Sequence, residues 1–133
     1  MDTHLLSYIA GFLDGEGCMR WDRGQPRIEV SHTYPHVLEE LCMALGGSIH
    51  KKREEAGRRP MFSWSVSGRR ALLALIKLGP HLKEKRNQAL LLQLMCDIRD
   101  EEYRDALDQA LRALKRIHYK TKPQENATNA SAD

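Results

Sequence analysis

The first residues that could do chemistry are two carboxylates in the stretch 9–17, which reads IAGFLDGEG. Asp14 and Glu16 alternate with glycines at the end of a segment whose apolar residues have helical spacing. The C-terminal end of a helix carries partial negative charge and therefore disfavours an acidic side chain. Because Glu16 stands there against this preference, its carboxylate indicates a metal ion or another functional partner.

The glycines of the same stretch are its second unusual feature. Each glycine inside a helix costs about 1 kcal/mol relative to alanine. Gly11 and Gly15 are four residues apart, with Ala10 and Asp14 beside them. Small residues at this spacing let two helix backbones approach closely. We therefore expect a tight helix–helix contact through these four residues, and a left-handed turn at Gly17 after the helix.

The elements around this stretch follow the order helix–strand–strand twice, and further helices come after them. Thr3 and Ser67 are the expected N-caps of the first and third helices. The expected helices cover residues 3–15, 35–45, 68–78, 83–98 and 103–117, and the expected strands residues 18–22, 26–33, 48–52 and 61–67.

These elements predict a single α+β domain over residues 1–118 and a disordered tail over residues 119–133. Four strands with one apolar face require helices on that face only. We therefore expect the order αββαββα with a four-stranded antiparallel sheet, followed by C-terminal helices.

The second face of the predicted sheet is polar and is left to solvent or to a ligand. Guanidinium, ammonium, carboxylate and hydroxyl groups are the mix that reads base edges and phosphates, and a two-stranded ribbon fits the major groove. An exposed sheet face is polar in any soluble protein, so a merely solvated face is the alternative. The residues that alternation places on this face are Arg20, Asp22, Gln25, Arg27, Glu29, Ser31, Ser48, His50, Lys52, Ser63 and Ser65.

Charge and composition narrow the class of protein. The net charge is only +3, but basic residues concentrate in 51–59 and 67–90 while acidic residues concentrate in 97–108. This asymmetry favours one basic surface, as nucleic acid requires. The three cysteines match no zinc or disulfide pattern. Neither a membrane span nor a secretion signal is recognisable, so we expect an intracellular protein that is not secreted.

The sequence resembles the LAGLIDADG homing endonucleases. The stretch IAGFLDGEG is similar to the signature of that family and matches it at Ala10, Gly11, Asp14 and Gly17. The order αββαββα is the order of the family, and the segment PHLKEKRNQALLL resembles the start of its later helix. The resemblance covers residues 3–98, and no helix-turn-helix, zinc or P-loop pattern competes with it.

The resemblance implies a DNA endonuclease that hydrolyses phosphodiester bonds with a divalent metal ion. Glu16 and the backbone carbonyl of Gly15 would bind Mg²⁺ or Mn²⁺, and Ca²⁺ would bind without cleavage. Lys85 would stabilise the developing phosphate charge, with Gln88 on the same helix face, and His32 would orient the attacking water. The structural alternatives are a solvated helix residue for Lys85 and a strand-end histidine for His32. Magnesium takes few protein carboxylates, which suits a single Glu16.

The resemblance also implies a partner, because the chain carries only one motif. Two chains joined through the face of Gly11 and Gly15 would bring two Glu16 side chains to a two-fold axis, with Asp14 supporting the helix interface. Such a homodimer would cleave a long pseudo-palindromic site in double-stranded DNA and would be intron-encoded. The alternatives are an intron RNA maturase, a non-cleaving DNA-binding regulator, or a structural dimerisation module.

One basic residue of the family pattern is missing after His32. The linker there reads TYPH and looks shortened. His36 and Arg53 are the candidates that could replace it.

Overall fold

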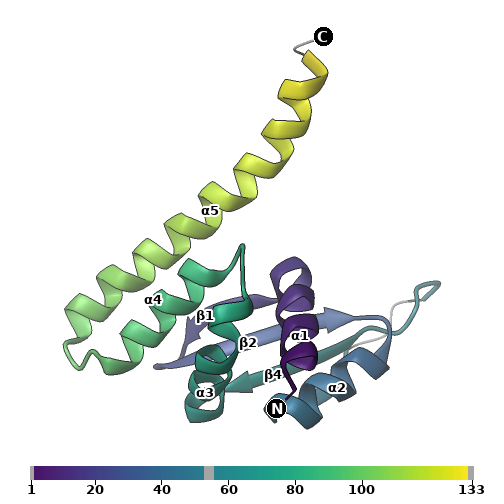
Figure 1. Ribbon diagram of the computed structural model, residues 1–133, viewed down its shortest axis with the longest axis horizontal. Helices are drawn as coiled ribbons and strands as arrows, with labels where there is room; N and C mark the ends of the chain where they lie inside the picture. The colour runs from purple at the N-terminus through teal and green to yellow at the C-terminus, as the bar shows by residue number, and fades with distance from the viewer. Residues whose placement is uncertain (1, 53–55, 132–133) are drawn as a thin grey trace.

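The computed structural model describes the backbone of residues 2–52 and 56–131, and the side chains of these residues up to residue 117. Their elements alternate as the sequence predicts, with two helix–strand–strand units ahead of the later helices (Figure 1). In chain order the elements are α1 (Thr3–Glu16), β1 (Cys18–Asp22), β2 (Gln25–His32), α2 (Pro35–Leu45), β3 (Ser48–Lys51), β4 (Phe62–Ser67), α3 (Gly68–Leu78), the 3₁₀ turn η1 (Gly79–His81), α4 (Arg86–Asp97) and α5 (Glu101–Ser131).

The four strands form one antiparallel sheet in the order β1-β2-β4-β3. β1 and β2 are joined by a two-residue turn, in which Arg23 and Gly24 have φ angles of 53° and 81°. Two positive φ angles are typical of the hairpin turn whose twist matches that of its strands. The predicted α+β fold with a four-stranded antiparallel sheet is therefore confirmed.

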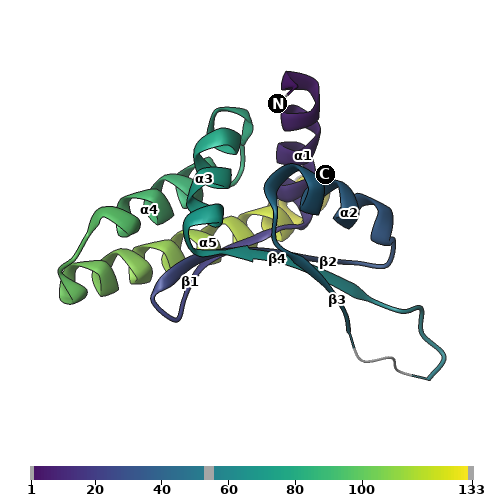
Figure 2. The same ribbon diagram turned by 90° about the horizontal axis from the view of Figure 1, so that it is seen from below.

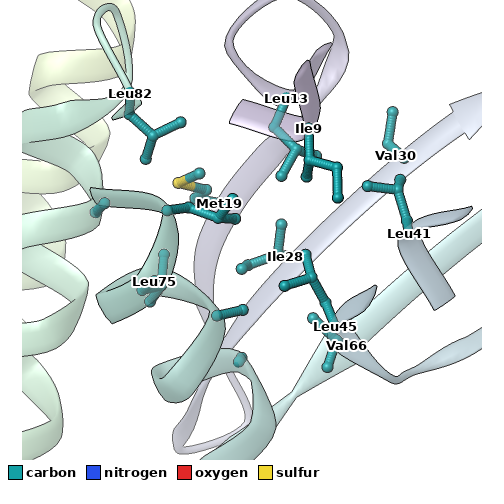
Figure 3. Close-up of a cluster of buried hydrophobic side chains, with 14 of the residues drawn as sticks. Ile9, Leu13, Met19, Ile28, Val30, Leu41, Leu45, Val66, Leu75 and Leu82 are labelled. Carbon is teal, nitrogen blue, oxygen red and sulfur yellow. The ribbon is translucent and has the colours of Figure 1, made fainter. Parts of the chain in front are cut away.

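The core lies between the sheet and the helices on one side of it, as Figure 2 shows for α1, α2 and α3. Ile28 and Trp64 belong to the buried face of the sheet. Figure 3 shows Ile9 and Leu13 of α1 packing above Ile28. Trp64 donates its indole N–H to the carbonyl of Gly46 at 2.9 Å, which satisfies its buried polar group. Buried positions alternate with partly exposed polar positions along β2, which leaves the opposite face of the sheet polar.

Some helix ends differ from the sequence expectation. Asp2, rather than Thr3, caps α1, and its carboxylate accepts from the backbone N–H of His4 at 3.1 Å. Gly17 is extended (φ −83°, ψ 161°) rather than left-handed. A Cβ at Gly17 would lie 2.9 Å from both Cδ2 and the carbonyl oxygen of Leu13, so close packing explains this glycine. α4 begins at Arg86 instead of residue 83, because the preceding backbone is held by α1 as described below.

α5 packs against α4 and passes beside β1. Its Arg104 guanidinium lies 5.3 Å from the centre of the Trp21 ring, and the ammonium of Lys115 lies 3.7 Å from the sulfur of Cys18. The helical backbone continues to Ser131, where the sequence predicts a disordered tail, and the tail side chains lie outside the described part. The division into a domain over 1–118 and a tail therefore stays a prediction. No helix among the described residues is long and apolar enough to cross a membrane.

Candidate active site

Asp14 joins the end of α1 to the beginning of α4. One carboxylate oxygen accepts from the backbone N–H of Lys83 at 2.9 Å, and the other accepts from the backbone N–H of Lys85 at 3.1 Å. These amides precede α4, where a helix lacks partners for its first N–H groups and where a negative charge is favourable. Asp14 thus supports a helix junction within one chain, and its place in a dimer interface stays a prediction.

Lys85 is one of two buried polar or charged residues among those described, with 8% of its surface exposed. It occupies the N-cap position of α4, and its ammonium donates to the carbonyl oxygen of Asp14 at 2.5 Å. The C-terminal carbonyls of a helix attract cations. The structure therefore places the Lys85 charge at the same end of α1 as Glu16, and the alternative of a solvated helix residue is wrong.

Gln88 is the second of these buried polar residues, with 3% of its surface exposed. It lies three positions after Lys85 in the first turn of α4. Within the described part of the chain its Oε1 has no hydrogen-bond partner. Buried acceptors are rarely left without a donor, and such exceptions often mark a functional position or a bound water.

Glu16 is the last residue of α1 and is exposed. Phe12 precedes it by one helical turn, so the two side chains project from the same side of α1. The ring of His32 contacts Phe12 edge to face, with the ring centres 5.7 Å apart. The helix thereby places His32 on the side that carries Glu16.

The orientation of the His32 ring is fixed by its own linker. Its Nδ1 accepts from the backbone N–H of Tyr34 at 3.0 Å, and the Tyr34 ring lies 6.1 Å away. A neutral imidazole whose Nδ1 is an acceptor carries its proton on Nε2. His32 can therefore donate one oriented hydrogen bond. The sequence did not predict that Phe12 and Tyr34 hold the His32 ring in place. An aromatic residue one turn before Glu16 could have indicated the contact of Phe12.

A metal ion would find few protein ligands here. No group of three or more His, Cys, Asp or Glu side chains that could hold a metal occurs in the described ranges. Glu16 supplies a carboxylate, and the last carbonyls of α1 lack helical partners. These are the hard oxygen ligands that Mg²⁺ prefers, and Mg²⁺ commonly completes its shell with water and phosphate. The residues fit a divalent ion that is shared with a nucleic acid.

The predicted polar face is organised by Glu29. Its carboxylate binds Arg20 at 3.1 Å from the neighbouring strand and Arg27 at 3.4 Å from its own strand. Glu29 therefore holds two guanidinium groups in place on this face. The hydroxyl of Ser48 and Nε2 of His50 are hydrogen-bonded at 3.1 Å. The remaining predicted positions on this face are Asp22, Gln25, Ser31, Lys52, Ser63 and Ser65, of which Lys52 lies just beyond β3.

The predicted dimer face needs one correction. Gly11 and Gly15 are exposed, and a Cβ added to either would meet nothing within 4 Å. Tyr8 lies on the same face and is 52% exposed. Ala10, by contrast, is fully buried, because its position on the helix turns it toward the core of its own chain. Its side chain is not available to a partner.

The two candidates for the missing basic residue remain untested. His36 is exposed and lies 3.7 Å from the carboxylate of Glu39, one turn along α2. Arg53 lies outside the described residues.

Comparison with solved structures identifies the fold. The homing endonuclease I-CvuI in complex with its target has a TM-score of 0.69 and 22% identity, over 85% of each chain. The archaeal intron-encoded homing endonuclease I-Vdi141I, complexed with DNA, has a TM-score of 0.58 and 21% identity, over 86% of this chain and 82% of its own. The I-SmaMI LAGLIDADG homing endonuclease, bound to cleaved DNA, has a TM-score of 0.51 and 17% identity, over 83% of this chain and 42% of its own.

No family model matches the sequence, and no match is found among the curated proteins. The structural likeness nevertheless confirms the fold that the resemblance implies. This chain has the α+β fold of the LAGLIDADG homing endonucleases.

Proposed function

We propose that this chain is a homing endonuclease that cleaves double-stranded DNA at a specific site. The observation that carries the proposal is that a buried lysine and an exposed carboxylate both lie at the C-terminal end of α1. Lys85 donates to the carbonyl of Asp14, two residues before Glu16. Hydrolysis of a phosphodiester requires positive charge near the phosphate and an activated water. The DNA complexes of the structural neighbours support the same activity.

Each residue of the site has a proposed role. Glu16 and the carbonyl of Gly15 would hold a divalent ion, Mg²⁺ or Mn²⁺, which when bound polarises the phosphate and lowers the pKa of water. Lys85 places an ammonium beside the developing phosphate charge, and Gln88 adds a buried acceptor in the first turn of the same helix. His32 donates through Nε2 and orients the attacking water. Ca²⁺ would bind these oxygens without supporting cleavage.

The active form is proposed to be a homodimer. Glycine at positions 11 and 15 lowers the stability of α1. No contact within the chain requires a glycine at either position, since a Cβ there would meet nothing within 4 Å. A second α1 can approach closely over such a stripe. Gly11→Leu should leave a monomer or an aggregate in sedimentation experiments. A wild-type protein that is monomeric on DNA, or a normal dimer of this variant, would show that the interface lies elsewhere.

The size of the domain sets the length of the target. A compact chain of this size has a radius of gyration of about 14 Å, so two domains side by side reach about 70 Å. This length corresponds to roughly 20 base pairs of B-DNA. Two identical sheets should read it as a pseudo-palindrome, with Gln25, Arg27, Glu29, His50 and Lys52 toward base edges in each half. The structural neighbours give no support to the maturase alternative, because they are complexes with a DNA target.

The test is to select bound duplexes from a random pool and to incubate them with the protein and either Mg²⁺ or EDTA. The proposal expects double-strand cleavage at the centre of the selected site with Mg²⁺ only. Selected binding without cleavage in Mg²⁺ or Mn²⁺ would favour the non-cleaving regulator. Failure to enrich any sequence would reject both.

A further inference from the structure

A shallow depression lies at one end of the polar sheet face, outside the active site described above. It includes the first residues of β2 and β3 and the last residues of β4, since Arg27 pairs with Ser67 and Ser48 pairs with Ser65. Its lining, which we call the rim depression, consists of Arg27, Gly47, Ser48, His50, Ser65, Val66, Ser67 and Arg70.

Arg70 is the unexpected member of this lining, because it belongs to α3, which packs on the covered side of the sheet. It lies beside Gly46, the first of two glycines that follow α2. A Cβ at Gly46 would lie 3.3 Å from Cδ and 3.6 Å from Nη1 of Arg70. Gly46 and Gly47 have φ angles of 81° and 91°, which favour glycine. The turn thus leaves space for the Arg70 side chain at the end of the sheet.

The lining has the chemistry of an anion site. It combines two guanidinium groups, an imidazole and three hydroxyl groups, and none of its residues is acidic. Outside the lining, the carboxylate of Glu29 binds Nε of Arg27 at 3.4 Å. Guanidinium and hydroxyl donors are the usual partners of phosphate oxygens in DNA complexes.

We propose that the rim depression binds one backbone phosphate of the DNA, with Arg70 as a principal cation. This inference rests on the proposed DNA-binding function. A backbone phosphate is favoured over a base edge for Arg70 because this residue enters the depression from α3, after the end of β4, whereas Arg27 and His50 lie on the strands and keep their proposed place toward base edges. When a ribbon occupies the major groove, base edges face its middle and the phosphates border the groove. Sequence reasoning missed Arg70, because alternation along strands assigns no helix residue to this face.

The neighbouring arginine provides a matched control. Arg69 is also exposed and carries the same charge, but it lines a different hollow, with Trp21, Pro26 and Leu72. Arg69→Gln and Arg70→Gln therefore change the net charge equally. Any difference between the two variants reports a local contact rather than the total charge of the protein.

The measurement is the salt dependence of binding to a random-sequence 24-base-pair duplex, by fluorescence anisotropy in Ca²⁺. Each phosphate contact contributes about 0.9 to the slope of log K against log salt concentration. Arg70→Gln should lower this slope by about 0.9 per protomer, and Arg69→Gln should leave it unchanged. Arg70→Lys should retain most of the slope. Thermal unfolding of each variant verifies that the fold is intact.

Three outcomes would overturn the inference. Equal slopes for the two glutamine variants would show that Arg70 makes no local phosphate contact. An unchanged slope in Arg70→Gln would show the same. A changed base preference in sites selected by Arg70→Gln would assign Arg70 to a base edge. If the wild type binds no duplex at all, the proposed function itself fails, which is a different result.

Discussion

Asp14→Asn should weaken the connection between α1 and α4. The two carboxylate oxygens of Asp14 accept from the backbone N–H groups of Lys83 and Lys85 at 2.9 and 3.1 Å. Hydrogen bonds to charged groups contribute about 1.5–3 kcal/mol each, and partial exposure of this carboxylate reduces that value. Asparagine keeps one acceptor oxygen, but its NH₂ group would face the second N–H. We expect the free energy of unfolding to fall by about 1–3 kcal/mol.

Urea unfolding followed by circular dichroism measures this change. With a slope of about 2 kcal/mol/M, the midpoint should fall by roughly 1 M. Asp22→Asn is the control, because Asp22 lies at the β1–β2 turn on the polar sheet face and should change the midpoint little. Asp14→Asn should also slow cleavage more than it weakens DNA binding, since Asp14 positions the backbone of Lys85. A midpoint equal to that of wild type would refute the assigned role of the two hydrogen bonds.

Two further substitutions test the packing at the end of α1 and the role of the buried lysine. Gly17→Ala should lower the free energy of unfolding by about 1–3 kcal/mol, because its Cβ would lie 2.9 Å from the Leu13 carbonyl oxygen. Gly15→Ala is the control and should not destabilise the fold, since a Cβ there meets nothing within 4 Å. Urea unfolding measures both changes. Equal stabilities of these two variants would contradict the packing argument. Lys85→Met should retain the fold and DNA binding but slow single-turnover cleavage by about 10²-fold or more. Unchanged cleavage by this variant would exclude its ammonium from the reaction.

Much of the fold follows from patterns along the chain. Alternation along β2 identified its buried face, and Gly46 and Gly47 marked the end of α2, because these signals depend on neighbouring residues only. The expected N-cap at Thr3 was off by one, since Asp2 offers an equally good acceptor. A left-handed Gly17 was wrong because the contact with Leu13, rather than the local turn, requires glycine there.

The site was harder to predict because its residues meet across the fold. The sequence named Glu16 and Lys85 through a family resemblance, but no spacing reveals that Asp14 holds the start of α4, sixty-nine and seventy-one positions away. The same holds for Arg70, which reaches the polar face from a helix on the other side. Ala10 was misplaced because small size alone does not distinguish a dimer face from a tightly packed core.

The most direct test of the central claim is cleavage of a selected duplex by wild type and by Glu16→Gln, in Mg²⁺. Glutamine keeps the size of the side chain but removes the charge that would hold the metal ion. We predict that the variant binds the duplex within about threefold of wild type, since Glu16 contacts no base in the proposed complex, and that it produces no double-strand product. Metal-dependent cleavage by Glu16→Gln at the wild-type rate would contradict the proposed active site.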